Sequence, residues 1–235
     1  MMQAPPAFDV ASVKRAEIKT DLYSINLGKI NRGEVTLGNA TFSDCLKFAY
    51  GLTSDIQLDG PEWMGRKGEF IYDIIGRASA ETPREQLLVM LQGLLNERFQ
   101  LVLHREQRQA SYLALVESKK GHKLEEADPG LSGAVNNTFH LGHLDTKGVY
   151  LGMLATVLSR FLRQPVLDMT GLRGRYVVKL DWTPDPVDAG KAEAAGTGPT
   201  IYTAVQEQLG LKLESRKGPL EVLVVDHAVK VPLAN

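Results

Sequence analysis

The chain has little of what would assign it to a specialised class of protein. It has one cysteine, Cys45, in 235 residues, so no disulfide can form within it and cysteine usage says little about its compartment. No apolar run approaches the roughly 18 residues that span a bilayer, so we expect no transmembrane segment. The net charge is −1 and both signs are dispersed, which gives no global field for nucleic acid or an anionic membrane.

The chemical motifs that would announce a reaction are also missing. There is no Gly-x-Ser-x-Gly elbow, and the string Gly171-Leu172-Arg173-Gly174 is too short for a phosphate-binding loop. What is present is an ordinary globular composition, 43% hydrophobic and 23% charged. The sequence therefore predicts a folded protein without naming its chemistry.

Hydrophobic periodicity predicts intermixed helices and strands. Thr41 is placed to cap a helix that ends at Gly51, because apolar residues recur after it at helical spacing. The string Thr82-Pro83-Arg84-Glu85 predicts a second helix start, with Thr82 as the cap and Glu85 completing a capping box. Strands are expected at 8–13, 34–37, 55–58, 70–75, 99–103 and 112–116, and in the second half at 166–167, 176–180, 211–213 and 221–225.

The order of these elements repeats along the chain. Leu46 corresponds to Leu154, and Glu97 to Glu207, at offsets of 154 − 46 = 108 and 207 − 97 = 110. The repeat predicts an α+β fold of two βαββαββ modules, with small mixed sheets each covered by two helices. We expect the modules at 1–118 and 138–235, joined by a polar, turn-rich linker at 119–137. Two unrelated modules with the same order are the alternative.

Several strings resemble a large family of uncharacterised, soil-associated proteins that are abundant in Acidobacteria. They include Phe8–Lys14, Gly60–Trp63, Leu95–Phe99, Asp168–Tyr176, Asp181–Asp185 and Asp226–His227. The resemblance implies a periplasmic or secreted location, with the signal peptide absent from this sequence. The repeated module also resembles the short interaction domains at the periplasmic entrance of secretins and TonB-dependent receptors. Calcium-assisted hydrolysis of N-acyl-homoserine lactones is a further activity that the resemblance implies.

Four polar residues lie at strand ends at comparable places in the two halves. A histidine with neighbouring carboxylates can act as a general acid or base, so these residues are the catalytic candidates. Exposed strand ends are the simpler alternative. The four residues are His104, Glu106, Asp226 and His227.

Two groups of side chains could bind a metal ion. His140, His143 and Asp145 carry ligands that zinc prefers, but a continuous strand would direct His140 away from the other two. An acidic loop offers oxygen ligands for calcium at Asp181, Asp185 and Asp188, with a solvated loop as the alternative.

The leading hypothesis is an extracytoplasmic binding or interaction protein without an evident catalytic site. A groove between the modules or an exposed sheet edge would bind a protein or a small apolar ligand. The alternative is a calcium-assisted hydrolase that opens the ring of an acyl-homoserine lactone. Convergent carboxylates would favour the enzyme, and an open strand edge would favour the binding protein.

Overall fold

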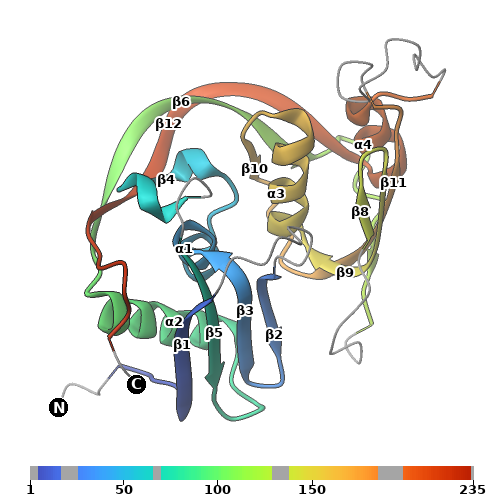
Figure 1. Ribbon diagram of the computed structural model, residues 1–235. Helices are drawn as coiled ribbons and strands as arrows, with labels where there is room; N and C mark the ends of the chain where they lie inside the picture. The colour runs from blue at the N-terminus through green and yellow to red at the C-terminus, as the bar shows by residue number, and fades with distance from the viewer. Residues whose placement is uncertain (1–4, 17–25, 66–69, 129–137, 185–197, 234–235) are drawn as a thin grey trace. The chain divides into compact units, whose positions relative to one another are not determined.

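The computed structural model describes residues 5–16, 26–65, 70–128, 138–184 and 198–233 (Figure 1). Helices and strands are intermixed along the chain, so the α+β class is confirmed. None of the described helices is both long and apolar enough to cross a bilayer.

The helices are α1 (Phe42–Tyr50), α2 (Arg84–Phe99), α3 (Leu151–Leu162) and α4 (Ile201–Leu209), with short 3-10 turns η1 (Asp55–Gln57) and η2 (Glu62–Met64). The strands are β1 (Val10–Ala16), β2 (Asn26–Asn31), β3 (Glu34–Thr41), β4 (Leu58–Asp59), β5 (Ile71–Arg77), β6 (Val102–Glu117), β7 (Glu125–Glu126), β8 (Thr138–His140), β9 (His143–Tyr150), β10 (Val166–Asp168), β11 (Arg175–Asp181) and β12 (Leu211–His227).

The strands form three four-stranded sheets. Their orders are β1-β5-β3-β2, β7-β11-β9-β8 and β10-β6-β12-β4. Every pair in the first two sheets is antiparallel, so the expectation of mixed sheets is wrong for them. The third sheet is mixed, because β10 runs parallel to β6 and β4 runs parallel to β12.

Residue contacts divide the chain into two compact units. The first unit comprises 1–108 and 219–235, and the second comprises 109–218. These bounds differ from those expected for the modules, because β6 and β12 each contribute residues to both units. Part of the segment expected to be a linker, 119–137, forms strand β7, which pairs with β11. The duplication itself stays a prediction.

The two longest strands, β6 and β12, were each predicted as two separate strands. The patterns at 99–103 and 112–116 predict two strands, but the chain forms one, β6, and β12 likewise replaces the pair at 211–213 and 221–225. In the middle of β6, from His104 to Gln109, no side chain is buried. The alternation of apolar side chains is interrupted there, although the backbone stays extended. In the sequence alone this interruption looks like a turn between two strands.

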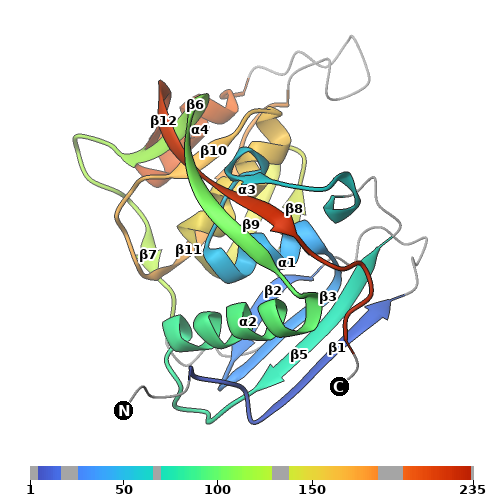
Figure 2. The same cartoon turned by 90° about the vertical axis from the view of Figure 1, so that its left-hand side faces the viewer.

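The core of the first unit lies between β1-β5-β3-β2 and the two helices α1 and α2, and Figure 2 shows α2 lying across one face of this sheet. Side chains of β5 alternate, with Tyr72 and Ile74 buried while Asp73 and Arg77 are exposed. The second unit is built in the same manner. Leu144 of β9 and Leu180 of β11 are buried with apolar residues of α3 and α4. Each antiparallel sheet therefore has one covered face and one open face.

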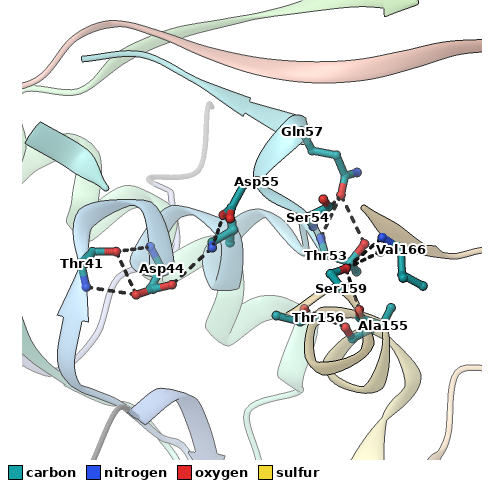
Figure 3. Close-up of polar contacts among 12 residues, drawn as sticks. Thr41, Asp44, Thr53, Ser54, Asp55, Gln57, Ala155, Thr156, Ser159 and Val166 are labelled. Carbon is teal, nitrogen blue, oxygen red and sulfur yellow. Dashed lines mark hydrogen bonds and ion pairs between the residues drawn. The ribbon is translucent and has the colours of Figure 1, made fainter. Parts of the chain in front are cut away.

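Local hydrogen bonds fix where α1 begins and ends. Figure 3 shows the Thr41 and Asp44 side chains pointing at each other, with Thr41 Oγ1 donating to Asp44 Oδ2 over 2.8 Å and accepting from Asp44 N–H over 3.1 Å. Gly51 ends the helix with a φ of 67°, which glycine adopts without strain. The predicted cap at Thr41 and the predicted end at Gly51 are confirmed.

The predicted start of α2 is wrong by one position. Pro83 occupies the capping position, and no side chain caps the helix. The Thr82 N–H donates instead to the Ser79 carbonyl over 3.0 Å, so Thr82 belongs to the preceding turn.

In the second unit a side chain fixes the start of a strand. Ser159 Oγ of α3 accepts from the Val166 N–H over 2.8 Å at the start of β10 (Figure 3).

Candidate functional site

A row of five polar side chains of the first unit crosses the third sheet, on strands β4, β6 and β12. His104, Glu106 and Arg108 are alternate residues of β6 and therefore share one face of that strand. His104 Nδ1 lies 2.8 Å from Asp226 Oδ2 on β12, and its Nε2 lies 3.1 Å from Glu106 Oε1. Arg108 then donates to Glu106 Oε2 over 2.8 Å and to Asp59 Oδ2 on β4 over 2.5 Å.

Three of the four residues expected to form a catalytic site therefore do lie together. His227 is not among them, because it follows Asp226 on β12 and adjacent strand residues point to opposite faces. Asp59 and Arg108 were not expected from the sequence. Arg108 could have been predicted from the sequence, because it follows His104 and Glu106 at the same two-residue spacing on β6.

Hydrogen bonds between opposite charges shift the pKa values of the row. The hydrogen bond with Asp226, and then that with Glu106, raises the pKa of His104 above its ordinary value of 6.5. His104 and Arg108 in turn lower the pKa of Glu106, and the Arg108 hydrogen bond lowers that of Asp59. All five side chains are between two fifths and half exposed, so the pairs contribute little stability each.

The geometry of the row suits a structural tie better than proton transfer. Both ring nitrogens of His104 face carboxylate oxygens, so when the ring is protonated it donates to both and has no lone pair left for a substrate. The chain's one thiol is no nucleophile for this site, since Cys45 is fully buried in α1 and its burial raises the pKa of the thiol. The row ties β4, β6 and β12 together on a solvent-exposed face.

The histidine string of the second unit is a hairpin and not a continuous strand. Leu141 and Gly142 form the turn between β8 and β9, with Gly142 at a φ of 89°. His140 and His143 are therefore directly opposite each other and share one face, which corrects the expectation that they point apart.

His143 nevertheless has a simpler partner than a metal ion. Its Nδ1 lies 2.6 Å from Asp181 Oδ1, the residue opposite it on β11. The first unit has Glu34 opposite Arg77 in the corresponding hairpin position, also at 2.6 Å. Two pairs of different chemistry in the same place indicate a cross-strand contact that stabilises the sheet.

The remaining metal candidates do not converge in the part of the chain that is described. Asp145 lies opposite Lys179 and Thr138, two residues along β9 from His143. Asp185 and Asp188 lie outside the described residues. Within the described ranges, no three histidine, cysteine or acidic side chains are grouped so that they could bind a metal ion.

A second feature of the first unit was not expected from the sequence. Strand β1 is at the end of its sheet, with β5 as its one strand neighbour among the described residues. At one end of β1 the Arg15 guanidinium lies 4.6 Å from the centre of the Phe70 ring, and Lys230 Nζ lies 5.3 Å from the same centre. The one available signal is that Arg15 shares its face with buried Val13, an unusual place for a charge.

The comparisons with known proteins identify a family and no function. No curated protein and no solved structure matches the chain. A family described as "Protein of unknown function (DUF3738)" matches residues 43–228, which include the second unit, both long strands and all ten site residues predicted from the sequence. Strands β1, β2 and β3 of the first unit lie outside the matched residues. The chain therefore belongs to the DUF3738 family.

Proposed function

We propose that this chain is an extracytoplasmic interaction protein that binds an extended segment of a partner protein along β1. The observation that carries the proposal is that β1 is an edge strand of its sheet within the described residues. An edge strand presents unpaired N–H and C=O groups, and an added strand can pair with them through main-chain hydrogen bonds. The seven residues of β1 offer about 23 Å of such backbone.

The other strands that end a sheet are shorter or less regular than β1. β4 and β7 have two residues each, and β8 and β10 have three. β2 has six, but its pairing with β3 shifts register between Asn26 and Lys29. β1 pairs with β5 in one uninterrupted register from Val10 to Ala16, so its open side has the regular spacing that a partner strand requires.

The test begins with selection of displayed random peptides on the purified protein. Backbone amide exchange is then measured by NMR with and without a selected peptide. Because alternate residues of an edge strand direct their N–H groups outward, we expect every second amide of β1 to gain protection. The amides of β5 are the internal control, since β5 already lies between β1 and β3. Protection elsewhere, with β1 unchanged, would overturn the proposal.

The extracytoplasmic location and the alternative hydrolase function rest on sequence resemblance alone. The location follows from the likeness of the quoted strings to exported proteins. Calcium-assisted opening of acyl-homoserine lactones stays a prediction, and turnover of a lactone panel with calcium, with a chelator and with denatured protein measures it directly. Ring opening that needs calcium would replace the binding function by the hydrolase. Mutation would then begin with Asp181 and Asp185.

A further inference from the structure

An aromatic ring and two cations meet at one end of β1. Phe70 is the outer member of an aromatic cluster, in edge contact with Trp63 at 6.1 Å between ring centres. Trp63 stacks on buried Phe42 at 5.3 Å, which anchors the cluster in the core of the first unit. The negative face of an aromatic ring attracts cations, and Arg15 and Lys230 both lie within range of Phe70.

The backbones that carry the two cations are fixed by Tyr72. Arg15 is directly opposite Tyr72 in the pairing of β1 with β5. The Tyr72 hydroxyl donates to the Lys230 carbonyl over 2.7 Å. The segment after β12 is held further by the Val229 N–H, which donates to the Phe99 carbonyl over 2.8 Å. The site is therefore positioned before any ligand arrives.

Neither cation has an acidic partner within the described part of the chain. Several other exposed cations of the first unit do, since Arg77 pairs with Glu34, Arg105 with Glu221 and Arg108 with Asp59. Arg15 and Lys230 are both exposed, and their charges add at one place on the surface. Two unpaired cations beside an apolar ring form a site for a carboxylate.

We propose that Arg15 and Lys230 bind an acidic side chain of the segment that pairs with β1, an inference that rests on the proposed function. In an added strand, the residue opposite Arg15 lies on the same face, with its Cβ about 5 Å from that of Arg15. A glutamate or aspartate at that position reaches the Arg15 guanidinium. The Lys230 ammonium lies beside the same Phe70 ring and adds a second positive charge.

The neighbouring inward positions of β1 define the rest of the motif. Val13 is buried and Ala11 packs against the core, so the residues opposite them lie beside apolar surface. Side chains on one face recur every second residue. The segment that fits therefore has an acidic residue, then an apolar residue two positions away, then another apolar residue after two more.

Fluorescein-labelled peptides of nine residues test the motif. The first has glutamate at position one, valine at three and five and threonine elsewhere, and a second has this order reversed, since the strand direction is not fixed. Each is compared with its glutamine counterpart by fluorescence anisotropy. We expect the glutamate peptide to bind about tenfold more tightly than the glutamine peptide. Arg15→Gln and Lys230→Gln should remove most of that preference. Lys14→Gln is the matched control, because Lys14 is on the other face of β1.

The outcomes separate the two proposals. Equal binding of the glutamate and glutamine peptides would overturn the acidic site and leave edge pairing intact. A preference for glutamate that survives in Arg15→Gln and Lys230→Gln would also overturn it. If no peptide binds, edge pairing fails and the acidic site fails with it. Peptides N-methylated at alternate residues identify edge pairing independently, because methylation on the edge that faces β1 abolishes binding and methylation on the other edge does not.

Discussion

The hydroxyl of Tyr72 should hold the segment that follows β12 against the first unit. Tyr72→Phe removes that hydroxyl and keeps the ring, whose centre lies 5.0 Å from that of Phe99 and 6.3 Å from that of Phe42. The hydrogen bond that is lost is the one in which the Tyr72 hydroxyl donates to the Lys230 carbonyl over 2.7 Å. Burial raises the pKa of Tyr72 to about 12, so the hydroxyl is a donor throughout the neutral range.

The magnitude follows from the kind of bond. A neutral hydrogen bond contributes about 1 kcal/mol net, and the ring contacts are unchanged. Lys230 is exposed, so water can satisfy its carbonyl once the segment opens. A change of about 1 kcal/mol raises the local opening equilibrium about fivefold.

Amide exchange followed by NMR measures this directly. The Val229 and Leu233 amides, which donate to the Phe99 and Arg98 carbonyls over 2.8 Å each, should exchange about fivefold faster in Tyr72→Phe. Tyr202→Phe is the matched control, because Tyr202 is exposed on α4 and its hydroxyl has no hydrogen bond within the described residues. Unchanged exchange at Val229 would refute the anchoring role of the Tyr72 hydroxyl and weaken the case that Lys230 is pre-positioned.

Two further predictions concern the helix caps and the polar row. Thr41→Ala removes the capping bonds with Asp44, and Thr200→Ala removes the bond to the Thr203 N–H of α4, so each should lower the free energy of unfolding by about 1 kcal/mol in urea titrations. An unchanged unfolding midpoint would show that the cap is redundant. The pKa of His104 is raised in the fold, so its contribution to stability is complete below the unfolded pKa of about 6.5 and is lost as the pH rises through the folded value. His104→Gln should therefore destabilise the protein more at about pH 5.5 than at about pH 8.5, and the reverse order would contradict the pairing of His104 with two carboxylates.

The features predicted correctly from the sequence are those whose causes lie within a few residues. The first helix is an example, because its cap at Thr41, its apolar periodicity and its end at Gly51 are all encoded in about ten neighbouring positions. The alternation of β5 is equally local. The segment at 55–58 was expected to be a strand and is mostly the turn η1, because Ser54 and Gln57 form a capping arrangement that favours the turn.

The candidate sites could be predicted less well. His104 and Glu106 are two residues apart, so the sequence brought them together on one face of a strand. Their link to Asp226 joins residues 122 positions apart, and it depends on which strands are neighbours in the sheet. The hairpin at Leu141 and Gly142 reversed the predicted geometry of His140 and His143, because a two-residue turn puts them opposite each other.

The sequence by itself determined the α+β class, most of the helices and strands, and the near-neutral charge, because each follows from composition or from short-range periodicity. Only the tertiary structure decided that β6 and β12 are single strands and that β1 is an edge strand among the described residues. It also decided that Arg15 and Lys230 meet on Phe70, with Tyr72 bonded to a carbonyl 158 positions away. The physical reason is that contacts between distant segments depend on strand order and register, which are set by the burial of the whole core and are not reported by any short stretch of sequence.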